Sequence, residues 1–268
     1  MFWNELLLVW WMIPLGVAIG VIGTLIGAGG GFILMPVLLL LYPDKPQEKL
    51  TAISLAMVFA NAVSGSISYA RMRRIDYRSG IAFALAGLPG AVLGRYLILA
   101  IASRVWFDRF FGLLMLLGSL FLLYKGLRQP KRQNLPPLGP PPGPSSMYRS
   151  LGLGVVVSFG VGILSSMLGI GGGIIHVPFM IYVLNFPVHI ATATSHFVLV
   201  FFSGTSVVVD LWRGVLQPGL AMAVCLSIGV IPGSVFGARI SKRIHGRWIV
   251  VTLAGALLLA AARILWRN

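Results

Sequence analysis

The chain has 268 residues, of which 57% are hydrophobic and only 10% are charged, and its mean hydropathy is +0.92. So few charged side chains cannot cover a surface that faces water on all sides, which excludes a soluble globular protein and predicts a multi-pass membrane protein. The formal net charge of +15 comes from cations in short stretches between apolar runs. We interpret these stretches as cytoplasmic loops beside an anionic leaflet, and not as a nucleic-acid interface.

Apolar segments follow one another along the whole chain. The long ones are residues 6–26, 50–70, 80–101, 107–124, 151–168, 191–209, 220–240 and 249–265, and two short ones are 32–41 and 174–184. A helix of about ten residues covers about 15 Å, roughly half of the hydrocarbon core. The sequence therefore predicts an all-α membrane protein with about eight transmembrane helices and two short helices that reach only one surface.

Two glycine-rich segments interrupt these apolar runs. Gly27–Gly31 reads G-A-G-G-G and is followed by F-I-L-M-P, which ends at Pro36; Gly169–Gly173 reads G-I-G-G-G and is followed by I-I-H-V-P, which ends at Pro178. Each glycine costs a helix about 1 kcal/mol relative to alanine. Unpaired backbone groups at membrane depth are tolerated only against protein or a water-filled cavity. We therefore predict two broken, re-entrant helices that face a buried polar site, where many transporters bind solutes.

Further motifs recur in the same order and indicate a duplication. Thr51-Ala52-Ile53-Ser54 corresponds to Thr192-Ala193-Thr194-Ser195, and a Pro-Gly-x-x-x-Gly motif occurs at Gly90 and Gly94 and again at Gly233 and Gly237. Chance does not preserve order and spacing together. We predict a first repeat over residues 1–127, a proline-rich cytoplasmic linker over 128–148 and a second repeat over 149–268.

Two arrangements of the halves remain open. If each glycine segment is a hairpin that enters and leaves on one side, the halves are inverted and loop 239–247 is cytoplasmic. If the first apolar run spans fully, the halves are parallel and that loop faces outward. Loop 239–247 carries more cations than the C-terminal end. Because cytoplasmic loops are enriched in Lys and Arg, we favour inverted repeats.

The predicted site is made of backbone groups. A helix that begins after a break has unpaired N–H groups and the positive end of its dipole, which together bind anions without a charged side chain. The residues concerned are Gly29, Gly30, Gly31, Gly171, Gly172 and Gly173, with Gly27, Pro36, Gly169 and Pro178 as structural positions of the same motifs. The alternative is that the glycines only permit close helix packing. Three consecutive glycines exceed that need, whereas Gly90, Gly94, Gly233 and Gly237 are interpreted as packing seams.

Polar side chains on the following helices are the second set of candidates. Ser54, Asn61, Ser195 and His196 could donate to a bound solute, or they could hydrogen-bond neighbouring helices. His176 replaces Leu34 of the first copy. An intramembrane histidine is a candidate proton carrier or anion donor, and the alternative is a histidine satisfied within the core.

The charged residues favour an anionic substrate. Asp76, Asp108 and Asp210 lie near predicted helix ends, whereas cation carriers usually place a carboxylate at mid-membrane. Arg95 and Arg239 follow the Pro-Gly motifs. We interpret them as anchors at the headgroups, and the alternative is that they steer anions. No paired carboxylates, Ser-His-Asp set or metal motif stands out, so neither an enzyme nor a metal or other cofactor is expected.

The glycine motifs, the Thr-Ala-x-Ser pairs and the Pro-Gly-x-x-x-Gly pairs resemble those of the sulfite exporter TauE/SafE family, also called the toluene sulfonate uptake permeases. The resemblance covers nearly the whole chain except the linker. It implies a multi-pass transporter of duplicated halves in the bacterial inner membrane. Such proteins mostly carry small sulfur-containing anions: sulfite, sulfonates, sulfoacetate or thiosulfate.

The resulting hypothesis is a secondary transporter of such an anion, which alternates access around a site at mid-membrane. A passive anion channel is the alternative, and an intramembrane enzyme or a structural subunit is a third. The expected partners are the small anion and the lipid bilayer, with no nucleic acid. The identity of the anion, the direction of transport, a homodimeric state and coupling to H⁺ or Na⁺ stay open.

Overall fold

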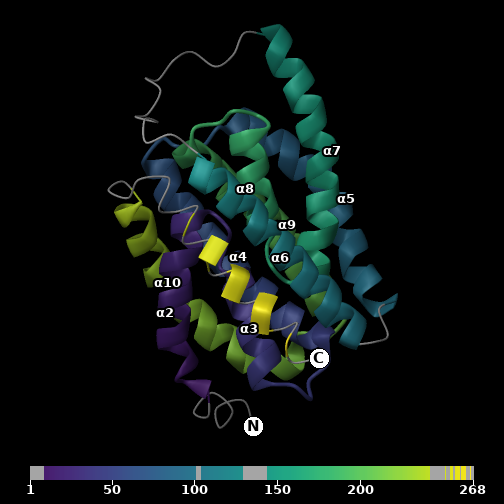
Figure 1. Cartoon of the computed structure of the whole chain (residues 1–268). Helices are drawn as coiled ribbons and strands as arrows, with labels where there is room; N and C mark the ends of the chain where they lie inside the picture. The colour runs from purple at the N-terminus through teal and green to yellow at the C-terminus, as the bar shows by residue number, and fades with distance from the viewer. Residues whose placement is uncertain are drawn as a thin grey trace.

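The computed structural model describes residues 9–100, 104–128 and 144–241, and short helical pieces between residues 251 and 266. These residues form helices and no strand, as predicted (Figure 1). The helices are α2 (Met12–Ile26), α3 (Gly31–Leu41), α4 (Gln47–Arg71), α5 (Tyr77–Ala100), α6 (Arg104–Arg128), α7 (Pro144–Leu168), α8 (Gly173–Tyr182), α9 (Val188–Trp212) and α10 (Leu220–Ile240), with a single 3₁₀ turn, η1 (Gln217–Gly219), before α10.

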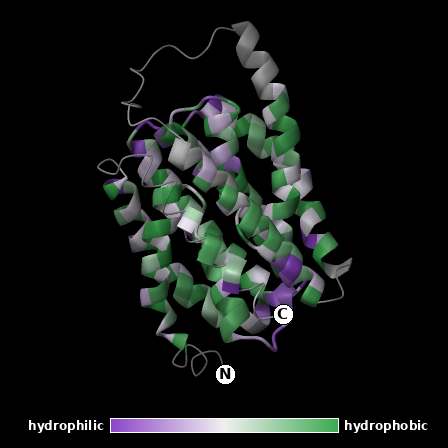
Figure 2. Cartoon of the chain, viewed as in Figure 1, coloured by the Kyte–Doolittle hydropathy of each residue, from purple (hydrophilic) through white to green (hydrophobic). Residues whose placement is uncertain are grey.

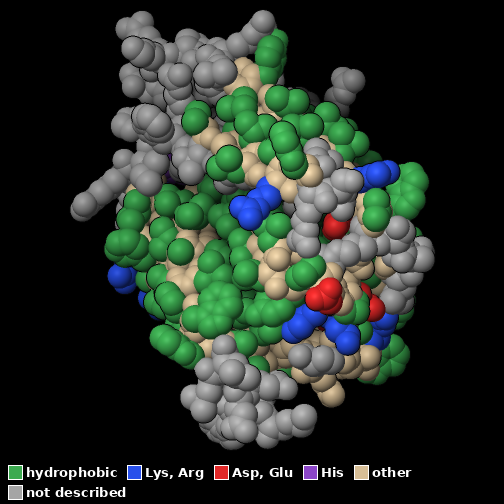
Figure 3. Space-filling model, turned by 60° about the horizontal axis from the view of Figure 1, so that its bottom comes forward, with side chains coloured by type: hydrophobic (Ala, Val, Ile, Leu, Met, Phe, Trp, Pro, Cys, Tyr) green, Lys and Arg blue, Asp and Glu red, His purple; other side chains and the backbone are tan. Residues whose placement is uncertain are grey.

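Four of the helices are long and apolar enough to cross a membrane. They cover Gln47–Arg71, Tyr77–Ile98, Val188–Trp212 and Leu220–Ile240. Hydrophobic residues predominate in the helices along the bundle (Figure 2). The face drawn in Figure 3 is largely hydrophobic, with a few acidic side chains gathered with Lys and Arg. Exposed Leu85, Val156 and Phe236 illustrate this apolar surface. These observations identify a multi-pass membrane protein.

Helix α7 begins inside the segment predicted as a linker. Helix α7 begins at Pro144, so the last residues of the segment predicted as linker are helical. Proline is favoured in the first turn of a helix, because that turn needs no N–H donor. Residues 129–143 and 242–250 lie outside the described part of the chain, and so does the predicted loop around Arg243.

Both glycine segments break the helix, as predicted. Helix α2 ends at Ile26 and α3 begins at Gly31, while α7 ends at Leu168 and α8 begins at Gly173. Gly27, Gly29 and Gly30 have φ angles of 78°, 76° and 83°, and Gly169, Gly171 and Gly172 have 70°, 85° and 76°. This left-handed conformation is open mainly to glycine. The same three positions of each motif therefore need glycine for their backbone alone.

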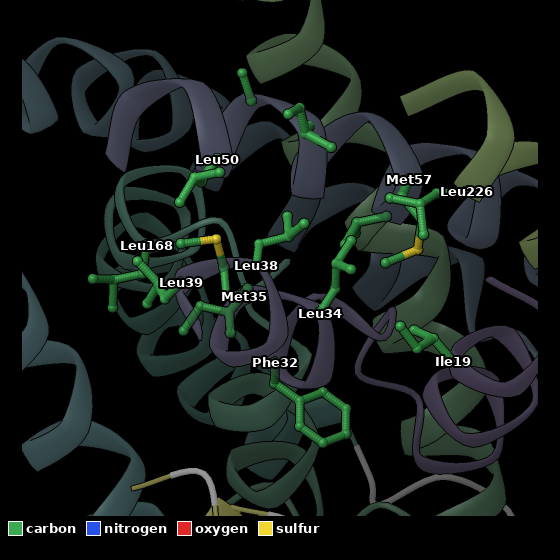
Figure 4. Packing of buried hydrophobic residues seen from close by; sticks show 14 of the residues in the cluster. Ile19, Phe32, Leu34, Met35, Leu38, Leu39, Leu50, Met57, Leu168 and Leu226 are labelled. Atoms are coloured by element: carbon green, nitrogen blue, oxygen red, sulfur yellow. The ribbon is translucent and has the colours of Figure 1, made fainter. Parts of the chain in front are cut away.

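Pro36 and Pro178 lie inside the short helices and do not end them. Helix α3 continues from Pro36 to Leu41, and α8 continues from Pro178 to Tyr182. These prolines therefore do not cap the ends of the short helices. A proline removes one internal hydrogen bond, which a buried helix tolerates when its neighbours hold it. The buried side chains of Phe32, Leu34 and Leu38 in α3 pack with residues of α2, α4 and α10, and these contacts hold the helix in place (Figure 4).

Each half packs its long helices against the other half. Helix α2 runs parallel to α10: a Cβ on Gly20 would clash with the Val230 carbonyl oxygen, and one on Gly237 with that of Val21. Helix α5 runs parallel to α7 in the same way, with Gly90 against Phe159. These two contacts contain all four glycines of the Pro-Gly-x-x-x-Gly motifs: Gly90, Gly94, Gly233 and Gly237. Small residues there let two helix backbones approach closely.

Helices α4 and α9 cross antiparallel in the middle of the bundle. The start of α4 meets the end of α9, where Glu48 pairs with Arg213. The end of α4 meets the start of α9, where the Asp76 N–H donates to Thr194 Oγ1 at 3.0 Å. The two short helices, α3 and α8, point toward opposite ends of the bundle (Figure 1). Helices α4 and α9 occupy equivalent positions in the two halves, so exchanging the halves would leave this crossing unchanged.

Each broken pair forms a hairpin. The loop after α3 returns to the end where α2 starts, because Lys45 contacts Met222 at the beginning of α10, the parallel neighbour of α2. In the second half, residues 183–187 connect α8 to α9. Helix α9 begins beside the start of α5, where Gly80 packs on Phe197. Helix α5 is in turn the parallel neighbour of α7. Both glycine breaks are consequently hairpin tips inside the bundle.

Candidate functional site

The two hairpin tips touch each other. A Cβ on Gly31 would lie 2.6 Å from the Gly169 carbonyl oxygen, and one on Gly173 would collide with the Gly27 carbonyl oxygen and with Ala28. All residues of both glycine segments are buried. The predicted six-glycine site is thus a single place in the molecule, formed from sequence positions in opposite halves.

Serines from the crossing helices hold each tip. The hydroxyl of Ser54 donates to the Gly169 carbonyl at 2.6 Å, and that of Ser195 donates to the Gly27 carbonyl at 3.2 Å. The two bonds are equivalent under exchange of the halves. Each serine proton is already used, so a solute at the tips would meet only the oxygen lone pairs of these two side chains.

The N-termini of α3 and α8 both start at the tips. Their N-cap residues, Gly30 and Gly172, provide no side-chain cap. The first N–H groups of a helix have no acceptor within the helix, and the dipole leaves partial positive charge there. Two such helix ends, buried and adjacent, form an environment that favours a small anion.

Asn61 and His196 are brought together beside the first tip by Thr24. The Thr24 hydroxyl donates to Asn61 Oδ1 at 2.9 Å and lies 3.4 Å from His196 Nε2. Asn61 Nδ2 has no hydrogen-bond partner, although Asn61 is fully buried, and it lies 3.8 Å from where a Cβ on Gly30 would be. A buried amide N–H₂ without an acceptor costs about 1–3 kcal/mol, so a ligand oxygen there would be stabilised.

His176 belongs to a different group of residues. Its Nε2 lies 3.0 Å from Ser158 Oγ, and its ring meets Phe83 edge-on and lies near Phe202. Its Nδ1 has no partner. His176 therefore does not lie with Asn61 and His196. If it contacts a bound solute, it does so from the side of the bundle formed by α7.

Arg95 is not a headgroup anchor, contrary to the sequence interpretation. It is fully buried and paired with Asp210, which is also fully buried. Its Nη1 donates to Thr51 Oγ1 at 2.9 Å and to the Ser166 carbonyl at 3.3 Å. The sequence interpretation failed because both residues lie near helix ends, where water or headgroups are normally within reach, whereas here α4, α7 and α9 enclose them.

Thr24 and Tyr69 were missed from the sequence, and Arg95 was assigned a different role, although the repeat carried a signal for all three. Thr24 precedes Gly27 by the same interval at which Ser166 precedes Gly169. The carbonyls at these equivalent positions are both capped: the Tyr69 hydroxyl donates to the Thr24 carbonyl at 2.7 Å, and Arg95 donates to that of Ser166. Within the described residues, no three His, Cys, Asp or Glu side chains gather as a metal site would require.

Comparison with known proteins gives one consistent answer. The family model for the sulfite exporter TauE/SafE matches residues 12–264. The probable membrane transporter protein YunE of Bacillus subtilis is 28% identical over 272 residues, covering 96% of this chain and 97% of that protein. A probable membrane transporter protein of Methanocaldococcus jannaschii is 22% identical over 264 residues, covering 94% and 93%. No solved structure matches the chain significantly.

Proposed function

The chain belongs to the sulfite exporter TauE/SafE family, and from that premise we propose that it is a secondary transporter of small sulfur-containing anions. The substrate class comprises sulfite and organic sulfonates such as sulfoacetate, and the membrane is the bacterial inner membrane. Transport proceeds by alternating access around the hairpin tips.

One observation carries this proposal: two uncapped helix N-termini, α3 and α8, start at touching tips inside the bundle. A sulfonate or sulfite group carries three oxygens around one sulfur. Backbone N–H groups from both tips can bind these oxygens from two sides, and Asn61 Nδ2 supplies a further donor. At the tips, positive charge comes from the dipoles of the two short helices.

Inverted repeats are part of the proposal. The antiparallel crossing of α4 and α9, and the hairpins that enter from opposite ends, support them. In such an arrangement each hairpin faces one side of the membrane, so displacement of one hairpin opens the tips to that side only. Because the tips are packed against each other here, they would have to separate to admit an anion. That requirement favours a carrier over the alternative of a passive channel.

The test is binding and flux with purified full-length protein. We expect sulfite or sulfoacetate to raise the melting temperature, because a ligand at about 100 times its dissociation constant stabilises the folded state by about 2.7 kcal/mol. Acetate and chloride at the same concentration and ionic strength serve as controls. Proteoliposomes should then exchange the radiolabelled anion. No stabilisation by any sulfur oxyanion, together with no exchange, would reject the function, and large single-molecule currents would identify the channel.

Asn61→Asp should weaken anion binding by about tenfold or more, a difference of about 1.4 kcal/mol. The substitution keeps the size of the side chain but replaces the unpartnered Nδ2 donor by a carboxylate oxygen close to the first tip. Binding is measured by thermal shift across a concentration series. The matched control is Asn185→Asp, because Asn185 lies exposed with a φ of 56° that aspartate tolerates. Equal affinities of the two variants would remove Asn61 from the site.

A further inference from the structure

The carboxylate of Asp210 is only half used. Arg95 Nε donates to Asp210 Oδ1 at 2.8 Å, and Arg95 Nη2 donates to the same oxygen. Asp210 Oδ2 has no hydrogen-bond partner and is buried. A carboxylate that meets a guanidinium usually places one oxygen on each arm of the fork. Here one oxygen accepts both donors and the other is left open within the bundle.

Arg95 connects this carboxylate to the second hairpin. Its Nη1 donates to the Ser166 carbonyl in the last turn of α7, just before the break, and to Thr51 Oγ1. Thr51 is the residue against which Gly169 packs. Thr51 is therefore the one residue that separates the Arg95 guanidinium from Gly169 at the tip. Among the buried residues that contact Arg95, Asp210 is the one that carries a negative charge.

The equivalent place in the first half has no such pair. There the neutral hydroxyl of Tyr69 caps the Thr24 carbonyl, and Tyr69 occupies in α4 the position that Asp210 occupies in α9. Capping the helix end thus requires neither a guanidinium nor a carboxylate, and a buried ion pair is seldom a gain in stability over neutral groups. The charges at this one end of the molecule call for another explanation.

We propose that Asp210 is a proton-binding site, and that its protonation frees Arg95 to bind the transported anion. When Asp210 is ionised, its carboxylate satisfies Arg95 and competes with the anion. A proton on Oδ2 removes that negative charge and leaves Arg95 buried without a counter-charge, which strongly favours an anion beside it. The proton and the anion then bind with positive coupling, and the pair moves without net charge. This inference depends on the transport function proposed above.

The surroundings of Asp210 contain a second, weaker ion pair. Arg213 from the end of α9 and Glu48 from the start of α4 lie next to it and pair with each other at 2.7 Å, with side chains 19% and 23% exposed. Arg213 also donates to the Arg95 carbonyl at 3.4 Å. The charges of Arg213 and Glu48 neutralise each other. A change in the charge of Asp210 therefore acts mainly on the guanidinium of Arg95.

The experiment measures anion affinity against pH in purified full-length protein. The probe is methanesulfonate, a strong acid whose charge stays constant, with sulfite as a second anion. For wild-type protein we expect the affinity to fall by up to about tenfold per pH unit as pH rises through the titration of Asp210, the limit for one linked proton. Asp210→Asn mimics the protonated carboxyl, so its affinity should be independent of pH and no weaker than that of wild type at low pH. Asp76→Asn, in the loop before α5, should behave as wild type.

Proteoliposomes give the second readout. An inward proton gradient should drive accumulation of methanesulfonate by wild-type protein, with acidification of the lumen seen by a trapped dye. Asp210→Asn should exchange the anion but not accumulate it. If Asp210→Asn does not fold, the neutral pair Arg95→Gln/Asp210→Asn is used, for which we expect weaker binding without pH dependence. If a variant without the Asp210 carboxylate keeps the pH dependence of wild type, Asp210 is not the proton-binding site, and the proposed transport function is unaffected. If wild-type protein binds neither anion at any pH, the proposed function fails as well.

Discussion

Gly173→Ala is expected to abolish anion transport, whereas Gly160→Ala leaves it intact. The φ angle of Gly173 is not in the left-handed region, so alanine is compatible with the backbone there. The added Cβ would collide with Ala28 and with the Gly27 carbonyl oxygen, which are backbone atoms that cannot rotate away. The tips would have to move apart. Overpacking of this kind costs about 1–3 kcal/mol.

Gly160 offers a matched control for this substitution. It lies in α7, before the same break, and a Cβ there would meet nothing within 4 Å. Gly160→Ala should be neutral or slightly stabilising, since alanine is the better helix former by about 1 kcal/mol. Anion exchange in proteoliposomes is measured for both variants after their insertion and melting temperature have been checked. If Gly173→Ala exchanges the anion as fast as Gly160→Ala, contact between the tips is irrelevant to transport.

The breaks were predictable from sequence because their cause is local. Runs such as Gly29–Gly31 destabilise a helix wherever they occur, and the left-handed angles at Gly29 and Gly30 follow from that composition. The duplication was equally visible, because it preserves order and spacing. The sequence could not show that the two hairpin tips touch each other, or which of their residues are in contact. The contact of Gly31 with Gly169 depends on how α4 and α9 cross, and no local pattern encodes this crossing.

The charged residues show the opposite case. Arg95 and Asp210 lie far apart in the sequence, and each lies near the C-terminal end of its helix, so each alone looked like an interfacial residue. Whether such a residue reaches water depends on the neighbouring helices. The enclosure of Arg95 by Thr51, Ser166 and Asp210 comes from three different helices. Comparison of the two repeats would have shown the anomaly, since Tyr69 stands where Asp210 stands in the second half.

Removal of one member of this pair should be among the most destabilising substitutions in the protein. Arg95→Met leaves Asp210 buried and uncompensated, and Asp210→Leu does the same to Arg95. Breaking a buried pair in this way typically costs about 3–5 kcal/mol, whereas replacement of both members by apolar residues of similar volume is often neutral. We therefore expect the double variant Arg95→Met/Asp210→Leu to be more stable than either single variant.

A double-mutant cycle on thermal unfolding in detergent measures this coupling, with the Glu48–Arg213 pair as its reference. That pair is partly exposed, so its coupling should not exceed about 1 kcal/mol. A coupling at Arg95–Asp210 as small as that of the reference pair would mean that water reaches the buried charges. The stable double variant has a further use, because it separates the two roles of the pair. It retains the fold but has no group to bind the proton and no guanidinium for the anion, so proton-driven accumulation should be absent from a protein that still melts cooperatively.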